Sequence, residues 1–353
     1  MEKIKKVRIG KRDVGDKEPC LIIAEAGSNH NGKYEQAKKL VDLAKDAGAD
    51  AVKFQVFRAE KIYPKSAGYS SYLEIQKPIY EIIKDMELPY DWIPKLSDHC
   101  EKKGLIFLAS VFDEGSVDML DDYVPAHKIA SYELNHIPLI KHAAKKRKPL
   151  IMSVGASSLE EIDEAVAAAH EEKNADVCLM QCTAKYPAPL VSINLKAIES
   201  LKKRYKIPVG LSDHSRDPLI APLGAVACGA NLIEKHFTID NNLPGPDHKF
   251  AVEPKELKEM VKSIRLMEEA MGSGEKHVLP IEKELYDFGK RAVYSTNGIK
   301  KGEVFTQDNI AVLRPGVKTR GLHPRYYEKI IGKRASGDIK SEEPITDVHI
   351  GKI

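Results

Sequence analysis

Two histidines occupy equivalent positions near the ends of two apolar, β-type segments of the chain. His214 lies in "GLSDHS" and His236 in "IEKHFTID". Successive side chains of a strand alternate between its two faces, so Ser212 would share a face with His214, and Glu234 with His236. Two imidazoles with open positions beside them suit Mn, Fe, Zn or another divalent ion, and we predict a shared metal site. The alternative is that both are structural, since a single strand histidine is more often part of the core.

Cationic and hydroxyl side chains stand at the ends of several other apolar segments. They are Lys53, Lys128, Ser110, Ser131, Ser153 and Ser212. Ammonium and hydroxyl donors together suit an anion that bears a phosphate and a carboxylate group. One alternative is that either lysine forms a structural ion pair with Glu25 or Glu234. Another is a Schiff-base lysine, because class I aldolases also use a lysine on a barrel strand.

The elements that would position these groups alternate between short β-rich runs and amphipathic helical runs. The runs that predict strands are 20–27, 49–57, 104–110, 127–131, 149–155, 176–183, 208–214 and 231–237. Segments such as 34–48, 158–173, 192–205 and 254–272 repeat apolar residues at three- and four-residue spacing, which indicates helices. Eight βα units over roughly 250 residues predict an α/β fold, the (β/α)8 TIM barrel. Neither GxGxxG nor a P-loop is present, which argues against a doubly wound nucleotide-binding sheet.

Each predicted strand begins apolar and ends polar, and the carboxyl ends of the strands form the catalytic face of a TIM barrel. The polar ends hold Glu25, Lys53, Gln55, Ser110, Lys128, Ser131, Ser153, Gln181, Thr183, Ser212, Asp213, His214, Glu234, Lys235 and His236. We therefore expect a ring of polar groups in the barrel mouth. Lys235 alternates with its neighbours, so we predict that it points outward, to an ion pair or into the space between strand and helix. Residues 58–90 are predicted to form a long loop on the same face. Asp247 and His248 follow the last strand in a Gly/Pro-rich loop, where such a pair by itself favours turn formation over catalysis.

Composition narrows the class of protein. The 353 residues have a formal net charge of +3, which does not indicate a basic surface for binding nucleic acid or an anionic membrane. Five cysteines without CxxC spacing favour reduced thiols. The N-terminus lacks the apolar core of a signal peptide, and the most apolar stretch, 219–230, is too short to span a bilayer. We expect a cytoplasmic protein.

A change of pattern near residue 275 predicts a second domain. We assign 1–275 to the barrel, 276–290 to a polar linker and 291–353 to a small domain of short strands punctuated by Gly, Pro and Asn. A domain of this size buries little core of its own, so we expect it to dock on another surface.

Seven motifs run in order along nearly the whole chain. They are "IIAEAGSNHNG" (22–32), "AGADAVKFQ" (47–55), "QCTAKYPAP" (181–189), "GLSDHS" (210–215), "IEKHFTID" (233–240), "GPDHKF" (245–250) and "LRPG" (313–316). Together they resemble the sialic acid synthase family, which makes N-acetylneuraminate and related nonulosonates. The C-terminal domain resembles the antifreeze-like module, also called SAF, a β-clip fold.

The resemblance implies an activity and a set of site residues. The activity is condensation of phosphoenolpyruvate with an open-chain N-acetylated hexosamine, giving a nine-carbon α-keto acid and phosphate. His214 and His236 would hold a divalent metal, Mn²⁺ or alternatively Mg²⁺ or Co²⁺, and Glu25 and Glu234 match essential carboxylates near the reacting centre. Positions that match phosphoenolpyruvate-binding residues are Lys53, Ser110, Lys128, Ser131, Ser153 and Ser212, and those that match sugar-binding residues are Gln55, Tyr186 and Asp247. The resemblance also implies a domain-swapped homodimer in which Arg314 caps the site of the partner.

Some positions depart from the family pattern. Ala184 stands where Ser or Asn is common, Asn241 and Asn242 replace a basic residue, and residues 58–80 lack an expected Tyr-Gln pattern. The sugar therefore stays open between N-acetylmannosamine and a 2,4-diacetamido-dideoxy sugar that leads to legionaminate or pseudaminate. The segments "AEAGSNHNG" and "PGPDHKF" favour the neuraminate or legionaminate branch. Two other functions compete: a class I Schiff-base aldolase acting on a keto sugar acid, and a non-enzymatic sugar-binding protein.

Overall fold

All eight predicted strands are present and pair in parallel around a closed barrel, which confirms the predicted fold class. They are β3 (Leu21–Gly27), β4 (Ala51–Val56), β5 (Ile106–Val111), β6 (His127–Ile129), β7 (Leu150–Ser153), β8 (Val177–Cys182), β9 (Val209–Asp213) and β10 (Leu232–His236). The barrel closes where β10 pairs with β3. This computed structural model describes residues 4–69, 77–174 and 176–350.

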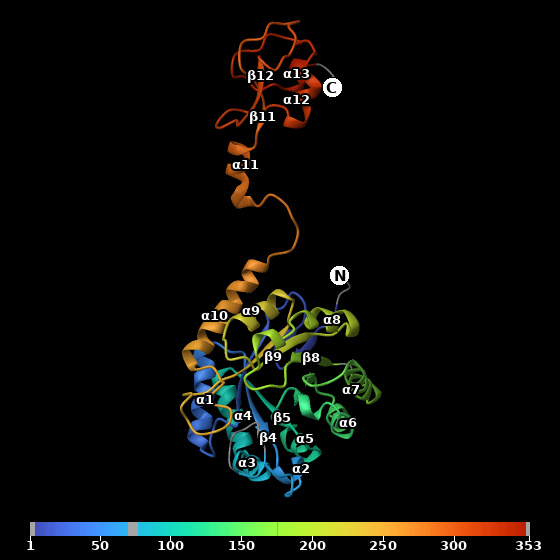
Figure 1. The fold of residues 1–353 in the computed structure, drawn as a ribbon, viewed down its shortest axis with the longest axis vertical. Coiled ribbons are helices and arrows are strands. Elements are labelled where there is room, and N and C mark those ends of the chain that lie inside the picture. Colours follow the sequence, from blue (N-terminus) through green and yellow to red (C-terminus); the bar gives the residue numbers. More distant parts are fainter. Residues whose placement is uncertain (1–3, 70–76, 175, 351–353) are drawn as a thin grey trace. The chain divides into compact units, whose positions relative to one another are not determined.

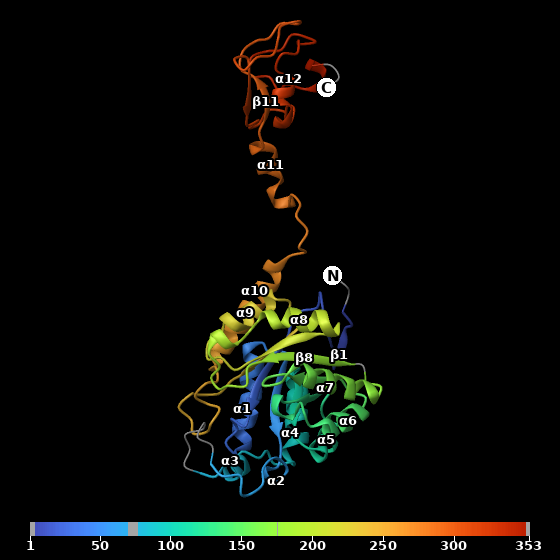
Figure 2. The same ribbon diagram turned by 45° about the vertical axis from the view of Figure 1, so that its right-hand side comes forward.

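Helices surround the barrel, as Figures 1 and 2 show. They are α1 (Tyr34–Ala47), α2 (Ala59–Ile62), α3 (Ile79–Asp85), α4 (Trp92–Lys103), α5 (Glu114–Leu120), α6 (Ile137–Lys145), α7 (Leu159–Glu171), α8 (Lys196–Tyr205), α9 (Ile220–Ala227) and α10 (Pro254–Met271). Two of these lie in the segment predicted as a long loop, since α2 and α3 interrupt residues 58–90. Residues 70–76 of that segment lie outside the described residues.

The two faces of each strand build two separate apolar cores. Residues such as Ile22, Val52 and Phe54 point outward and pack against the helices. Residues of the opposite parity, such as Ile23 and Leu108, fill the barrel interior. The same parity, continued to the carboxyl ends of the strands, turns the polar residues of the mouth inward above an apolar floor.

A short hairpin covers the amino-terminal end of the barrel and was not predicted. Its strands are β1 (Val7–Ile9) and β2 (Arg12–Val14), which pair antiparallel. Val7, Ile9 and Val14 are buried and join the interior core. Strands of three residues are too short to display a two-residue period, so the sequence pattern does not reveal them.

The second unit, Ser273–Ile353, has its own small core. It contains α11 (Lys283–Gly289), β11 (Ala292–Ser295), β12 (Ile310–Leu313), α12 (Tyr327–Ile330) and α13 (Asp347–Ile350). β11 and β12 pair antiparallel, and isolated bridges such as Ile299 with Ile339 extend the β structure. Phe305, Ile310 and Ile345 are fully buried in its core. The unit is thus built of short strands and turns, which agrees with the predicted β-rich character.

Two other observations bear on the class of protein. The described part of the chain contains no helix that is both long and apolar enough to cross a membrane. All five cysteines are free, which agrees with the prediction of reduced thiols.

An ionic clamp ties the amino-terminal end of the barrel together. The Asp50 carboxylate, which precedes β4, accepts a hydrogen bond from the backbone N–H of Ile22 at 2.9 Å. Arg265 of α10 donates to it at 2.7 Å, and Arg12 of the hairpin also donates to it. One side chain therefore connects β3, α10 and the hairpin.

Replacing Asp50 should destabilise the barrel without touching the mouth. We expect Asp50→Ala to lower the free energy of unfolding by about 2–3 kcal/mol, because three donors lose a charged acceptor. Asp50→Asn, which keeps an oxygen for Ile22, should lose less. Urea unfolding followed by circular dichroism measures both, and equal unfolding midpoints for all three proteins would contradict the clamp.

Candidate active site

Strand register brings the predicted site residues together as direct neighbours. Ser212 is paired with Glu234 across β9 and β10, and His236 is paired with Glu25 across β10 and β3. Glu25 in turn faces Lys53, Gln55 faces Ser110, and Ser110 faces Lys128. Paired residues of parallel strands point to the same face, so these side chains line one continuous arc of the barrel mouth.

Four buried charges form the centre of this arc. The Lys53 ammonium lies 2.7 Å from Glu25 and 3.6 Å from Glu234. The Lys128 ammonium lies 3.4 Å from Glu234. The side chains of all four residues are at most 4% exposed, so each charge depends on the others for compensation. The lysine–glutamate ion pairs that the sequence left open as an alternative are therefore present.

Hydroxyl groups complete the surroundings of the two lysines. Lys53 donates to Ser110 at 2.8 Å, and Lys128 donates to Ser153 at 2.9 Å. Ser212 donates to Glu234 at 3.1 Å. Ser131 accepts a hydrogen bond from the backbone N–H of Gly155 at 3.1 Å. The arrangement offers two cations and several hydroxyls to one small anion.

The charge cluster sets the protonation of its members. Burial opposes the charge on Lys53, but Glu234 and Glu25 outweigh it and raise the pKa of Lys53. Burial dominates at Lys128 and lowers its pKa. At Glu234 burial acts against ionisation, yet Lys128 and Lys53 hold its pKa below the usual value. Burial and then the charge of Glu234 raise the pKa of Glu25, against the opposing effect of Lys53.

The two histidines lie side by side as predicted, with ring centroids 5.4 Å apart. The Nδ1 atom of His214 is 2.8 Å from the carbonyl oxygen of Thr183, which can only accept, so Nδ1 donates and Nε2 keeps a lone pair. The Nδ1 atom of His236 is buried and has no hydrogen-bond partner among the described residues. Burial lowers the pKa of His214 to about 4 and that of His236 well below its usual value. Both rings are therefore neutral, the form that binds metals.

The histidine pair fits a divalent metal that keeps open coordination positions. The described part of the chain contains no group of three or more His, Cys, Asp or Glu side chains placed to hold an ion. A metal on His214 and His236 would therefore leave sites for water or substrate, as catalytic metals do. The orphaned Nδ1 of His236 and the oriented ring of His214 are the features that favour this interpretation.

An aromatic wall borders the histidines. Tyr186 stacks on His214 with centroids 4.0 Å apart and meets His236 edge-on at 5.8 Å. Phe250 packs on Tyr186 at 5.2 Å and on His236 at 5.1 Å. The predicted sugar-binding residue Tyr186 thus lies directly beside the predicted metal ligands.

The other two predicted sugar-binding residues of the barrel meet around a glycine. A side-chain carbon at Gly27 would lie 3.3 Å from both Asp247 and Glu25, and 3.5 Å from Gln55. Gln55 donates to Glu25 at 3.0 Å. Gly27 also has a left-handed φ of +52°, so glycine suits this position for its backbone and for the space it leaves. Burial raises the pKa of Asp247 to about 7.

Two residues at the mouth were missed by the sequence analysis. Cys182 is buried at the end of β8, with its sulfur 3.6 Å from His214 Nδ1. Glu133 ends the 3₁₀ turn Ser131–Glu133 after β6, and its buried Oε2 has no hydrogen-bond partner among the described residues. Burial raises the pKa of Glu133 to about 7. A signal existed for Cys182, because it has the inward parity of β8.

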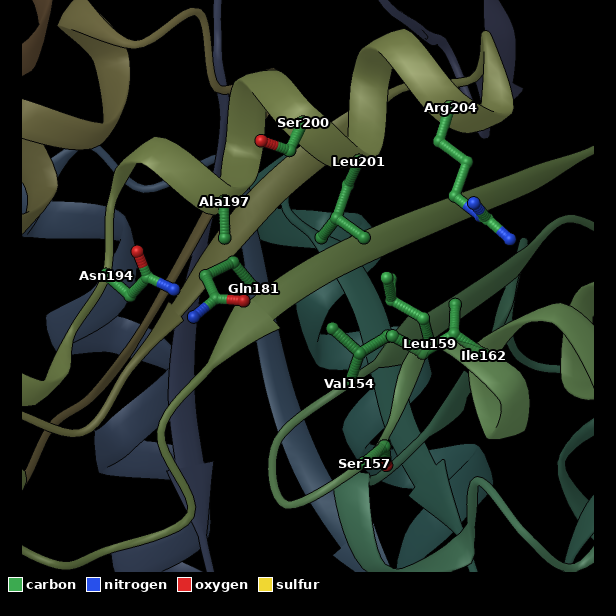
Figure 3. Close-up of a pocket in the computed structure, with 10 residues that line it drawn as sticks. All are labelled: Val154, Ser157, Leu159, Ile162, Gln181, Asn194, Ala197, Ser200, Leu201 and Arg204. Carbon is green, nitrogen blue, oxygen red and sulfur yellow. The ribbon is translucent and has the colours of Figure 1, made fainter.

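The same parity corrects three members of the predicted ring. Asp213 faces outward, to Lys235, and the Thr183 hydroxyl donates to the carbonyl of Ser192 at 2.7 Å. Gln181 does not face the mouth: its amide donates to the carbonyl of Ile193, outside the barrel. There it lines a cavity of about 400 Å³ beside α7 and α8, with Leu201, Ile162 and others (Figure 3). The prediction failed because polarity was taken as evidence of direction, whereas strand alternation decides it.

Lys235 points outward, as predicted, and fixes the loop that carries His214. Its ammonium lies 2.6 Å from Asp213 and donates to the backbone carbonyls of Ser215 and Asp217 at 2.5 and 2.9 Å. The pair is almost fully buried, with 1% and 0% of the side chains exposed. Burial lowers the pKa of Lys235, partly offset by Asp213. Contacts on both sides of His214 thus converge on one ammonium group.

Arg314 lies in the second unit, just after β12, and is exposed. Its loop is attached to α11, since Gly316 donates to the carbonyl of Phe288 at 3.1 Å and Arg320 lies over the ring of Tyr286 at 4.9 Å. The role of Arg314 at a barrel mouth stays a prediction.

Comparison with known proteins gives consistent matches along the chain. Residues 40–276 match the NeuB family and residues 290–351 match the SAF domain. The spore coat polysaccharide biosynthesis protein SpsE of Bacillus subtilis is 46% identical over 96% of this chain and 95% of its own. The N,N'-diacetyllegionaminic acid synthase of Campylobacter jejuni is 40% identical over 93% of this chain and 99% of its own. The crystal structure of the N-acetylneuraminic acid synthetase of Leptospira borgpetersenii in complex with citrate superposes with a TM-score of 0.74 at 33% identity, covering 82% of this chain and 98% of that chain.

Removing the Lys235 ammonium should disturb the predicted metal site from outside the barrel. We expect Lys235→Met to lower the free energy of unfolding by about 3–5 kcal/mol, because it leaves the buried Asp213 carboxylate without its cation. The double variant Lys235→Met/Asp213→Leu should recover part of that stability. Both should bind Mn²⁺ more weakly in calorimetric titration, since the His214 loop loses its anchor. Wild-type Mn²⁺ affinity in the double variant would show that the anchor does not position His214.

Glu133 should make stability depend on pH. Its pKa of about 7 in the folded protein exceeds the unfolded value, so its stabilising contribution is complete at low pH and is lost as the pH rises towards 7. Glu133→Gln cannot ionise and should gain about 1–3 kcal/mol relative to wild type between pH 5 and pH 8. Urea unfolding at the two pH values measures this, with Glu101→Gln on the exposed face of α4 as control. A constant difference between wild type and Glu133→Gln would contradict the shift.

Proposed function

The chain belongs to the NeuB family and has a SAF domain, and from this premise we propose that it is a nonulosonate synthase. It condenses phosphoenolpyruvate and water with an open-chain N-acetylated hexosamine, giving a nine-carbon α-keto acid and phosphate. The observation that supports this best is the mouth itself, where two buried lysines with serine hydroxyls adjoin two neutral histidines. An anionic enol donor and an aldehyde acceptor require these two environments next to each other.

Phosphoenolpyruvate is proposed to bind at the lysine side of the mouth. Its phosphate and carboxylate match the donors of Lys53, Ser110, Lys128, Ser131, Ser153 and Ser212. Glu25 and Glu234 compensate the lysine charges, so the cluster of four charges is close to neutral as a whole. Charge-assisted hydrogen bonds from fixed donors hold the enol in one orientation.

The amino sugar is proposed to bind at the opposite side. Gln55, Tyr186 and Asp247 would contact its hydroxyl and acetamido groups. We propose that the protein forms a homodimer in which Arg314 of the second domain covers the sugar site of the partner. The polar segment 276–290 would be the linker that joins a barrel domain, 1–275, to a SAF domain, 291–353.

A divalent metal, Mn²⁺ in the first place and Mg²⁺ or Co²⁺ as alternatives, is proposed to bind His214 and His236. When bound, it would supply Lewis acidity at the aldehyde oxygen of the sugar. The stacked Tyr186 ring keeps His214 in place, and the Thr183 carbonyl keeps its Nε2 free of a proton.

The protein residues account for the remaining steps. Held by the lysines, C3 of the enol attacks the aldehyde carbon, and positive charge develops at C2. Water then adds to C2 while Glu25 or Glu234 takes its proton, and the former aldehyde oxygen gains a proton to become a hydroxyl of the product. The tetrahedral intermediate loses phosphate by cleavage of the C2–O bond, which leaves the keto group at C2. Lys53 lies 2.7 Å from Glu25 and 3.6 Å from Glu234, so both carboxylates adjoin the proposed phosphoenolpyruvate site.

The sugar is proposed to be N-acetylmannosamine or a 2,4-diacetamido-dideoxyhexose, with the neuraminate and legionaminate branches favoured over pseudaminate. We also propose that the enzyme acts in the cytoplasm.

Product analysis tests the proposal. Wild-type protein with Mn²⁺, phosphoenolpyruvate and a panel of these sugars should release phosphate and form an α-keto acid of the matching mass in mass spectrometry. Lys53→Met should abolish both signals. Borohydride treatment with pyruvate checks the aldolase alternative and should leave the chain unmodified. A borohydride adduct on Lys53 or Lys128, or no product from any sugar with folded, metal-bound protein, would reject the synthase.

A further inference from the structure

We propose that His248 is a positioning residue, which fixes the loop after β10 so that the carboxylate of Asp247 stands in the barrel mouth. The inference rests on the proposed function in one respect, the contact between Asp247 and the amino sugar. His248 itself would touch no substrate.

His248 connects the loops of the last and the first βα units. Its side chain is fully buried, with Nδ1 2.6 Å from the hydroxyl oxygen of Thr238 and Nε2 3.0 Å from Asn31 Oδ1. Thr238 lies two residues after β10, and Asn31 lies between β3 and α1. A neutral imidazole satisfies both contacts at once, accepting from the Thr238 hydroxyl and donating to the Asn31 carbonyl.

The backbone of the same loop closes tightly around the imidazole. A side-chain carbon at Gly245 would lie 2.9 Å from His248 Cδ2 and 3.3 Å from Asn31 Oδ1, so only glycine fits without displacing the ring. The Asn241 amide donates to the carbonyl of His248 at 2.6 Å and to that of Ala251 at 2.8 Å. Side-chain and main-chain contacts therefore hold residue 248 in one place.

Asp247 has no such support of its own. None of the described residues donates a hydrogen bond to its carboxylate, and the neutral His236 ring has its Nδ1 4.0 Å away. Its position above Gly27 follows from the backbone of the loop. His248 is the adjacent residue and is anchored at both ring nitrogens. The geometry therefore makes His248 the group that positions the Asp247 carboxylate.

A purely structural role predicts a different outcome from a positioning role. If His248 only stabilised the fold, its removal would reduce the amount of active protein and would leave the KM of both substrates unchanged. If it positions Asp247, its removal changes the KM of the sugar, while the lysine side of the mouth keeps its KM for phosphoenolpyruvate.

The first test is His248→Ala in the full-length protein with Mn²⁺. We expect the KM of the amino sugar to rise about tenfold, the size expected from losing one or two hydrogen bonds, and the KM of phosphoenolpyruvate to change less than about twofold. His99→Ala is the matched control, because His99 also bridges two elements, bonding Asp42 at 3.0 Å between α4 and α1, far from the mouth. It should alter neither KM.

Two further variants keep the test decisive if His248→Ala does not fold. Asn31→Ala removes one of the two anchors from a partly exposed position and should produce the same selective change. His248→Gln keeps a donor for Asn31 and should retain a sugar KM between those of wild type and His248→Ala.

A double-mutant cycle with Asp247 identifies the route of the effect. If His248 acts through Asp247, then Asp247→Ala and Asp247→Ala/His248→Ala should have the same sugar KM, and calorimetric titration of the sugar should give the same weakened affinity. Additive effects, or a sugar KM that stays at the wild-type value in both His248→Ala and Asn31→Ala, would overturn the inference. Failure of the proposed function is distinguishable, because wild-type protein would then form no product with any sugar.

Discussion

The structure depends on a buried set of four charges that can exist only if all four are present. Lys53, Glu25, Glu234 and Lys128 lie within 4 Å of at least one opposite charge, and their side chains are almost completely withdrawn from water. Burial of a single ion costs several kcal/mol, so the loss of any one partner leaves a charge without compensation. A closed parallel barrel suits this cluster, because hydrogen-bonded register fixes the four strands relative to one another. Beneath the cluster the interior is apolar, with Ile23 and Leu108 among its residues. Water there would not compensate a charge whose partner had been removed.

Strand β10 shows how one short segment serves two opposite environments. Glu234 and His236 belong to the mouth, whereas Lys235 between them belongs to the layer outside the barrel. Three consecutive ionisable residues are tolerated in a buried strand because each one meets a partner or a site on its own face. The outward ion pair of Lys235 with Asp213 also supports the mouth, since the contacts of Lys235 flank His214 on the neighbouring loop. The outward ion pair thus links the stability of the sheet to the position of His214, a proposed metal ligand.

Much of this arrangement follows from periodicity. The β-rich runs predicted all eight strands, and the two-residue alternation assigned Glu234, Lys235 and His236 to their correct faces. The prediction for Gln181 was wrong because this alternation was not applied to β8. The inward-facing neighbour, Cys182, was missed for the same reason. The hairpin β1–β2 escaped prediction because three-residue strands show no period, and their burial comes from the barrel they cover. Glu133 and the anchors of His248 lie in turns, where side-chain direction depends on tertiary contacts that no local pattern encodes.

The pairing of β10 with β3 closes the barrel and also brings together site residues that lie far apart in the sequence. Here His236 is paired with Glu25, and the backbone N–H of Phe237 donates to the Glu25 carbonyl at 2.9 Å. Asn29 donates back to the Phe237 carbonyl at 2.9 Å across 208 residues of sequence. Glu25 lies on the first barrel strand and Glu234 and His236 on the last, so the complete set of carboxylates and histidines forms only when the barrel closes. Contacts between residues so far apart in the sequence form late in folding, because closing the long loop between them costs conformational entropy. An open barrel would therefore hold the lysines without their full compensation, and the charge cluster itself favours closure over any partly assembled form.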